Sequence, residues 1–311
     1  MPRFSVIIPC FNRTQFLEKA IQAVLQQSVT SFEVIVVDDG SDDPAAQVIA
    51  NICNMDDRVR LIRKPENKGV SAARNTGLAS AQGDYICFLD DDDRLGSGFF
   101  QYALDCFEDQ PGIGIAICPS AVDPDSCKSH LQYHILKETL KKQPRRRIYQ
   151  KQNAGLLYHY PPQINSMVFR SAIFNENHFE ESLNIGEDIY LWFTILEANY
   201  RFGKKVTKTP LAFIRVHDDD QLSQPEHKQI IDFQEKLRSD FGKMDTSLEM
   251  IIDLKLFMRY SLSKNYARAF TMLFRSMRKP LMFMRFAGNQ ILLKLRIIFS
   301  YFLYKTFRVD L

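Results

Sequence analysis

The sequence lacks several features that would mark a protein class. Its six cysteines include no Cys-x-x-Cys pair and all lie within the first 127 residues, so we expect buried, reduced thiols rather than zinc ligands or disulfides. Glycine and proline number 13 each among 311 residues, which leaves no low-complexity linker. The composition, 45% hydrophobic and 25% charged, excludes a disordered chain and a collagen, and the length suffices for one large or two medium domains.

Long apolar runs are missing as well. The run Phe4–Ile8 is too short for a signal peptide and ends at Pro9, so we expect no targeting segment. A charge-free stretch at 152–169 contains two consecutive prolines, whereas a bilayer core requires about 20 mostly apolar residues. We therefore expect no transmembrane span.

Negative charge is scarce at one end of the chain. Residues 1–253 hold 28 Lys and Arg against 36 Asp and Glu, a net charge of −8, whereas residues 254–311 hold 12 against 1, a net charge of +11. In 290–309, aromatic and aliphatic residues surround Lys294 and Arg296, a pattern typical of a basic amphipathic helix in a membrane interface. The alternative is a helical subdomain that packs on the body with its basic face in water.

Apolar periodicity in the first 120 residues alternates between strands and helices. The expected strands are 4–8, 33–37, 59–62, 85–89 and 113–118, and the expected helices between them are 13–27, 43–54, 69–81 and 97–109. Strands joined by helical crossovers predict an α/β fold with a Rossmann-like, mostly parallel sheet flanked by helices. Ligands of such sheets bind beyond the carboxyl ends of the strands.

Acidic residues gather at that edge of the expected sheet. Asp38 and Asp39 follow the second strand, and Asp90–Asp93 follow the fourth. Four consecutive aspartates repel one another, and a divalent cation such as Mn²⁺ or Mg²⁺, which prefers oxygen ligands, would relieve that repulsion. The alternative is a solvated acidic loop in which Asp92 or Asp93 caps a helix. The two clusters need not share a role, since carboxylates also accept hydrogen bonds from a base N–H or a ribose hydroxyl.

The rest of the chain is less regular. Segment 120–185 carries no clear pattern, and we expect Lys141–Arg147 to be a solvated basic turn. The remaining predicted elements are a helix at 187–198, a strand at 211–216, and helices at 226–241 and 246–259.

Four segments stand in order along the first 93 residues: Phe4–Asn12, Val36–Asp42, Asn67–Gly77 and Gly83–Asp93. Further on come Glu187-Asp188 with Leu191-Trp192, and Arg215-Val-His217 with Ser223. Together they resemble the motif series of family 2 glycosyltransferases with the GT-A fold. The resemblance covers about the first 220 residues.

The resemblance implies a nucleotide-sugar donor, Mn²⁺ or Mg²⁺, and an inverting single displacement. The residues that it assigns to the donor are Pro9, Phe11, Asn12, Asp39, Arg74, Asp90 and Asp91. Among them Asp39 would accept a hydrogen bond from the base of the nucleotide. The metal would be held by Asp92 and His217. Asp188 would be the general base, with Glu187 as its neighbour.

Each assignment has a structural alternative. Asn12 would cap the helix expected from residue 13, with Gln15 completing a capping box. Arg74 would be an exposed helix residue, and His217 a structural histidine at a strand end. The Glu-Asp pair would only complement a helix N-terminus.

The sequence departs from the family pattern at three positions. Phe11 replaces the usual tyrosine, Thr194 stands where an arginine is common, and Asp91 adds a charge at a variable position. The first loses a hydroxyl but keeps a ring that stacks.

We therefore predict a metal-dependent inverting glycosyltransferase that uses a UDP-sugar and acts on a lipid-linked or cell-envelope glycan. Residues 1–225 would form the catalytic domain, with a nucleotide-binding half, 1–120, and an acceptor-side half, 121–225. Residues 226–311 would form a helical region whose basic tail holds the enzyme at the cytoplasmic face of the cell membrane.

Two other function classes are weighed against this prediction. One is a catalytically inactive glycan- or nucleotide-binding module of the same fold. The other, a nucleotidyltransferase, would require a Gly-rich phosphate loop that residues 9–13 do not form. The aromatic content of the tail favours a membrane surface over nucleic acid as its partner.

Overall fold

The computed structural model describes residues 2–125, 148–159, 161–205, 207, 209–215, 226–263 and 265–277. These residues form two compact units, one drawn from Met1–Gln150 and Tyr160–Ser223 and the other from Lys151–His159 and Gln224–Leu311. Within the described ranges, no helix combines the length and the apolar character that crossing a bilayer requires.

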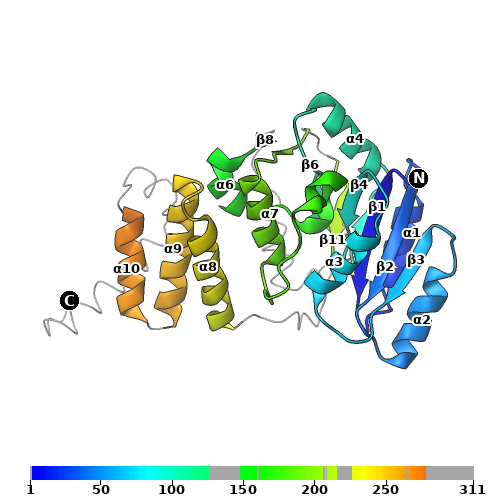
Figure 1. Cartoon of the computed structure of the whole chain (residues 1–311), viewed down its shortest axis with the longest axis horizontal. Coiled ribbons are helices and arrows are strands. Elements are labelled where there is room, and N and C mark those ends of the chain that lie inside the picture. The colour runs from blue at the N-terminus through cyan, green and yellow to red at the C-terminus, as the bar shows by residue number, and fades with distance from the viewer. Residues whose placement is uncertain are drawn as a thin grey trace, which may run out of the picture. The chain divides into compact units, whose positions relative to one another are not determined.

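The first unit is built on a twisted sheet whose first four strands are parallel (Figure 1). These are β1 (Phe4–Cys10), β2 (Phe32–Asp38), β3 (Val59–Arg63) and β4 (Tyr85–Phe88). The helices that connect and follow them are α1 (Leu17–Leu25), α2 (Asp43–Cys53), α3 (Val70–Ser80) and α4 (Phe99–Asp109). The α/β alternation predicted from the sequence is confirmed.

The alternation of side chains along β1 sorts the helices onto the two faces of the sheet. Phe4, Val6 and Ile8 belong to one buried apolar cluster with residues of α1, α2 and α4. Ile7 points to the other face, toward α3. A Cβ at Gly77 of α3 would lie 2.4 Å from the Ile7 side chain, so glycine allows α3 to pack closely on β1.

An antiparallel strand interrupts the expected parallel order. The sheet runs β3-β2-β1-β4-β9-β6-β10-β8, and β9 (Met167–Arg170) is antiparallel to both β4 and β6 (Ile115–Ile117). The predicted strand 113–118 therefore does not pair with β4. The other members are β10 (Phe202–Gly203) and β8 (Ile148–Tyr149).

A second, three-stranded sheet lies within the same unit. It has the order β5-β11-β7, with β5 (Arg94–Leu95), β11 (Ala212–Ile214) and β7 (Ser120–Val122). The helix α7 (Glu187–Glu197) and the 3₁₀ turns η2 (Ile164–Ser166) and η3 (Ser171–Asn175) complete the unit. The predicted strand 211–216 and helix 187–198 are thus present with slightly shorter bounds.

Both helix-capping interpretations are wrong. Helix α1 begins at Leu17 rather than at residue 13, and Asn12 adopts a left-handed conformation with φ of 55°. The Asn12 side chain instead accepts from Asp42 N at 2.9 Å and so ties the loop after β1 to the loop after β2. No helix follows Asp93 directly, since α4 begins at Phe99.

The described residues of the second unit form helices, and the predicted helices 226–241 and 246–259 correspond to two of them. The unit contains η1 (Lys151–Asn153), α6 (Ala154–His159), α8 (His227–Phe241), α9 (Thr246–Leu262) and α10 (Tyr266–Met277). The sequence did not predict that α6 belongs to this unit, where Lys255 Nζ of α9 lies 3.7 Å from the centroid of the Tyr158 ring. The predicted interfacial helix at 290–309 and the basic turn Lys141–Arg147 lie outside the described residues.

The expectation of buried thiols is confirmed for five of the six cysteines. Cys10, Cys53, Cys87, Cys106 and Cys118 are buried and unbridged. The sixth lies outside the described residues.

Candidate functional site

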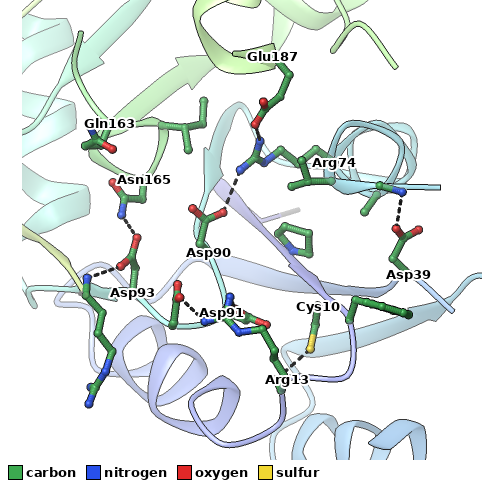
Figure 2. A pocket seen from close by; sticks show the side chains of 18 of the residues that line it. Cys10, Arg13, Asp39, Arg74, Asp90, Asp91, Asp93, Gln163, Asn165 and Glu187 are labelled. Atoms are coloured by element: carbon green, nitrogen blue, oxygen red, sulfur yellow. Dashed lines mark hydrogen bonds and ion pairs between the residues drawn. The ribbon is translucent and has the colours of Figure 1, made fainter. Parts of the chain in front are cut away.

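A cavity of about 490 Å³ opens at the carboxyl ends of β1, β2 and β4 (Figure 2). The predicted site residues that line it are Pro9, Phe11, Asp39, Arg74, Asp90, Asp91, Asp92 and Glu187. Asn12 and Asp188 are near neighbours in sequence but are not among the described lining residues. His217 lies outside the described part of the chain. Residues from four separate motifs therefore meet at one cavity.

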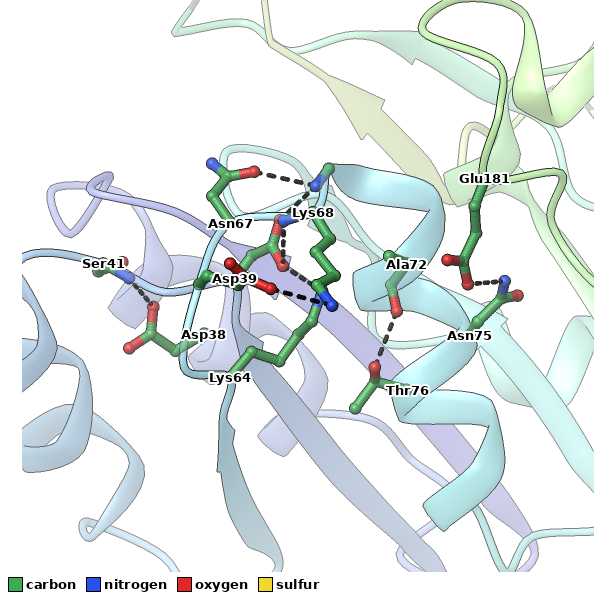
Figure 3. Close-up of polar contacts among 12 residues, drawn as sticks. Asp38, Asp39, Ser41, Lys64, Asn67, Lys68, Ala72, Asn75, Thr76 and Glu181 are labelled. Atoms are coloured by element: carbon green, nitrogen blue, oxygen red, sulfur yellow. Dashed lines mark hydrogen bonds and ion pairs between the residues drawn. The ribbon is translucent and has the colours of Figure 1, made fainter.

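Asp39, in the loop after β2, is held mainly by backbone groups. Its carboxylate accepts from Gly69 N at 2.7 Å and from Lys68 N at 3.2 Å, and it forms an ion pair with Lys64 (Figure 3). Gly40, with φ of 80°, allows this arrangement, because a Cβ there would lie 2.6 Å from the backbone of Glu66. Asp39 is 4% exposed and reaches the cavity wall. It is therefore a rigidly placed hydrogen-bond acceptor.

Asp38, in contrast, has a structural role. It is fully buried and accepts from Ser41 N at 2.9 Å, while Arg63 Nε lies 3.6 Å from its other oxygen. The Ser41 hydroxyl in turn accepts from Asn12 N at 2.8 Å. The two adjacent aspartates thus have different roles: Asp38 fixes the loop, and Asp39 faces the cavity.

Arg74 of α3 joins two of the acidic motifs. Its guanidinium donates to Asp90 and to Glu187, each at 2.9 Å, and the residue is 3% exposed. The alternative of an exposed helix residue is therefore wrong. Its Nε has no hydrogen-bond partner among the described residues. Arg74 neutralises one carboxylate from the loop after β4 and one from the start of α7.

The neighbouring Asn75 holds the segment that leads into α7. Its side-chain amide accepts from Phe179 N at 2.9 Å and donates to Phe179 O at 2.9 Å and to Glu181 at 2.8 Å. The Phe179 ring packs edge-on against Phe88 of β4 at 5.0 Å. Arg74 and Asn75 together fasten the segment Phe179–Glu187 to α3.

The four consecutive aspartates have different partners. Arg13 forms an ion pair with Asp92, and its Nη1 lies 3.4 Å from Asp91. Asp93 is buried and accepts from Asn165 and, at 2.7 Å, from Arg215 N. Burial raises the pKa of Asp91 to about 7, with the charge of Asp92 adding to the shift and Arg13 opposing it. The cluster is thus partly neutralised by two cations, Arg13 of the loop after β1 and Arg74 of α3.

The first turn of α7 carries the predicted catalytic pair. Glu187 lines the cavity and contacts Arg74, whereas the Asp188 carboxylate accepts from Ile189 N at 2.7 Å. Burial raises the pKa of Asp188 to about 7, with the charge of Glu187 adding to the shift and Arg74 opposing it. A carboxylate with this pKa can take up a proton near neutral pH.

Several residues that line the cavity were not assigned a role in the site from the sequence. They are Arg13, Asp93, Asn165 and Arg215. Arg13 directly follows the Pro-Cys-Phe-Asn segment, and Asp93 ends the aspartate run, so both adjoin recognised motifs. Asn165 lies in the irregular segment 120–185 and gave no local signal. Its Oδ1 is buried and has no hydrogen-bond partner in the described structure.

Comparison with known proteins identifies the fold. S. aureus TarS 1–349 in complex with UDP-GlcNAc superposes with a TM-score of 0.59 at 16% sequence identity, covering 98% of this chain and 81% of that one. The mannosyltransferase PcManGT from Pyrobaculum calidifontis, in complex with GDP-Man and Mn²⁺, gives 0.60 at 16% identity, with 99% and 82% covered. The likeness supports a GT-A type α/β fold.

Sequence comparison gives the family. A GalNAc(5)-diNAcBac-PP-undecaprenol beta-1,3-glucosyltransferase from Campylobacter jejuni is 42% identical over 99 residues, 32% of each chain. The chain spans only 29% to 39% of the length of the first curated relatives that it matches. The family model for glycosyl transferase family 2 matches residues 5–174, more than half of the sequence, and includes the loops after β1, β2 and β4. On this match, the chain belongs to glycosyl transferase family 2.

Proposed function

We propose that this protein is a metal-dependent inverting glycosyltransferase that moves a sugar from a nucleotide-sugar donor to a lipid-linked or cell-envelope glycan. The observation that carries the proposal is the convergence on one cavity of Asp39, the Asp90–Asp92 cluster and Glu187. These groups come from the loops after β2 and β4 and from the first turn of α7, and each would supply a different chemical function.

The donor's nucleotide would bind between the loops after β1 and β2. Phe11 is 40% exposed on the cavity wall, where its ring offers a stacking surface beside Pro9. Asp39 would accept from the N3–H of a uracil ring, and its fixed position on the cavity wall supports the proposal of a UDP-sugar. Asn12 would support both by linking the two loops. The UDP-GlcNAc bound by S. aureus TarS is consistent with this choice.

The aspartate cluster suits a hard divalent cation. Among the described residues, no three His, Cys, Asp or Glu side chains are grouped as a complete metal site. Mn²⁺ and Mg²⁺ commonly use one or two carboxylates and take further oxygens from substrate phosphates, and Asn165 adds an unpartnered oxygen nearby. Asp92 would hold the ion, with His217 as a second ligand. When bound, the ion would stabilise negative charge on the departing diphosphate.

A carboxylate of the chain would take up the proton of the acceptor hydroxyl. The acceptor oxygen forms a bond to the anomeric carbon from the face opposite the diphosphate as the sugar–phosphate bond breaks, which inverts the configuration. The hydroxyl proton passes to Asp188, whose raised pKa suits a base near neutral pH. Arg74 would hold Glu187, and through it the first turn of α7, in position for this transfer.

The acceptor is proposed from the tail and from a relative. The C. jejuni enzyme is named for an undecaprenol-linked substrate, and residues 254–311 carry a net charge of +11. An enzyme held at the inner face of the membrane would meet such an acceptor directly. Because α10 ends at Met277, removal of 278–311 should leave the described helices intact. The truncated protein should lose binding to anionic vesicles, and unchanged binding would contradict the proposal.

Donor hydrolysis tests the proposed activity. The protein would be offered UDP-, dTDP- and GDP-sugars with Mn²⁺ or Mg²⁺, and release of the nucleoside diphosphate would be followed beside Asp92→Ala and Asp188→Ala. Metal-dependent release from one donor, lost in Asp92→Ala, would support the transferase and identify its sugar. Tight binding without release would indicate that turnover requires the acceptor. If no donor is bound, the inactive-module alternative is favoured.

A further inference from the structure

We propose that Arg13 is an exchangeable counter-cation of the aspartate cluster: a divalent metal displaces its guanidinium from Asp92, and the guanidinium then binds the donor's diphosphate. The inference rests on the proposed function, because it requires that a metal and a diphosphate meet in this cavity.

The contacts of Arg13 carry the first step. Its guanidinium pairs with Asp92 and approaches Asp91 at 3.4 Å, on the wall of the cavity (Figure 2). The two aspartate side chains are 10% and 6% exposed, whereas the Arg13 side chain is 35% exposed. A solvent-accessible cation therefore neutralises two carboxylates that are nearly buried. Moving this cation further into water restores its hydration, and a metal at the same place would compensate the charge of the two carboxylates that it leaves.

The other aspartates of the cluster are held by groups that cannot leave as easily. Asp90 is paired with Arg74, whose side chain is 4% exposed and also bound to Glu187. Asp93 is held by the Asn165 amide and the backbone N–H of Arg215. Release of either partner would leave buried polar groups unpaired, which is costly. The ion pair at Asp92 is thus the contact in the cluster that a metal can replace most readily.

The backbone of Arg13 limits where its side chain can go. The Cys10 thiol donates to Arg13 O at 3.3 Å, which ties residue 13 to the end of β1. The backbone of Arg13 therefore remains beside the cavity, so a guanidinium that a metal at Asp92 repels is still within reach of a diphosphate bound there. A diphosphate supplies the oxygens that a guanidinium binds in a bidentate manner. The metal and the diphosphate should consequently bind with positive coupling, each strengthening the other.

Manganese binding without nucleotide is the first test. Bound and free Mn²⁺ would be separated by electron paramagnetic resonance for wild type, Arg13→Gln and Arg58→Gln. Arg58 is a matched control because its side chain is 37% exposed and paired with Asp56 but does not line the cavity. We expect Arg13→Gln to bind Mn²⁺ about tenfold more tightly than wild type and Arg58→Gln to be unchanged. Equal or weaker binding by Arg13→Gln would overturn the inference.

Nucleotide binding is the second test, because removal of any nearby positive charge would favour Mn²⁺. With saturating Mn²⁺, the affinities for UDP and for GDP would be measured by calorimetry. We expect Arg13→Gln to weaken binding of the preferred nucleotide about tenfold, opposite in sign to its effect on the metal. Unchanged or tighter nucleotide binding would mean that Arg13 only repels the metal, and would overturn the exchange.

The two failures are distinguishable. If wild type binds neither UDP nor GDP, the proposed function fails and the diphosphate step fails with it, while the Mn²⁺ measurement still decides whether Arg13 and the metal compete. If a nucleotide binds but the opposed effects are absent, the proposed function stands and the inference fails. Equal thermal melting of the two arginine variants and wild type would show that their folds are intact.

Discussion

The loops after β2 and β4 both present aspartates to the same cavity, but they are stabilised in different ways. In the loop after β2, backbone N–H groups and one lysine hold Asp39, and Asp38 is buried beneath it. In the loop after β4, arginines from α3 and from the loop after β1 hold Asp90 and Asp92. Backbone donors predominate at Asp39, whereas side-chain cations hold Asp90 and Asp92.

This difference matches two kinds of recognition. A carboxylate fixed by backbone donors keeps its position and suits a ligand that must be read at a constant geometry, such as a base edge. A carboxylate neutralised by a side chain can change partners and suits a metal ion that arrives with a substrate. The same residue type thus serves two purposes because its partners differ in mobility.

The largest expected effect is that of a substitution at Asp92, in the loop after β4. Asp92→Asn should lower turnover about a thousandfold, since it weakens the site that stabilises the leaving diphosphate. Initial rates of donor hydrolysis at saturating donor would measure it. A change confined to the donor KM would show that Asp92 binds the ground state and the transition state equally and does not accelerate the chemical step.

The next effect concerns Asp188, the proposed general base. Asp188→Asn should reduce turnover by about a hundredfold to a thousandfold, because the acceptor proton loses its carrier. In the wild type, the rate should rise with pH through about 7 as Asp188 loses its proton. Glu187→Gln is the matched control and should retain this rise. A rise that persists in Asp188→Asn but vanishes in Glu187→Gln would reverse the two assignments.

Arg74 contacts the loop after β4 and also influences the pKa of Asp188, the proposed general base. The positive charge of Arg74 lowers the pKa of Asp188 against the effect of burial, so Arg74→Gln should move the rising limb of the pH profile to higher pH. Turnover at pH 7 should fall about tenfold to a hundredfold, as expected for lost positioning. Arg74→Lys keeps the charge and should shift the limb less. A lower rate with an unmoved limb would assign Arg74 a purely structural role.

A smaller effect is expected for the loop after β2. Asp39→Asn should raise the donor KM about tenfold with little change in turnover at saturation, because in the proposed site the carboxylate binds the nucleobase and not the reacting atoms. Measurement of both constants for the preferred donor would test it. An equal loss in turnover would place Asp39 in the chemistry.

The smallest effect concerns stability. Asp38→Ala removes the acceptor for the buried Ser41 N–H and should cost about 1–3 kcal/mol. For a chain of this size the melting temperature should fall by a few degrees, roughly 2–4 °C per kcal/mol. The variant Asp57→Ala, at an exposed position, is the control and should melt as wild type.

Much of the site could be predicted because local patterns specify the strands and their order. Apolar runs and helical periodicity predicted β1 to β4 and the helices between them, and parallel topology placed their carboxyl ends at one edge. Eight of the predicted site residues reach the cavity for this reason. The strand β9 and the helix α6 were missed, since they are short segments whose conformation depends on distant partners.

The sequence by itself determined the α/β alternation, the motif order and the edge at which the carboxylates gather, since these follow from side-chain periodicity within each segment. Tertiary structure decided which carboxylate is held by backbone donors and which is paired with a solvent-accessible arginine. The left-handed turn at Asn12 depends on Ser41 and Asp42, and the pairing of Arg13 with Asp92 joins residues 79 positions apart. Such contacts arise only when the sheet brings its loops together, because partner, burial and mobility are properties of the folded neighbourhood.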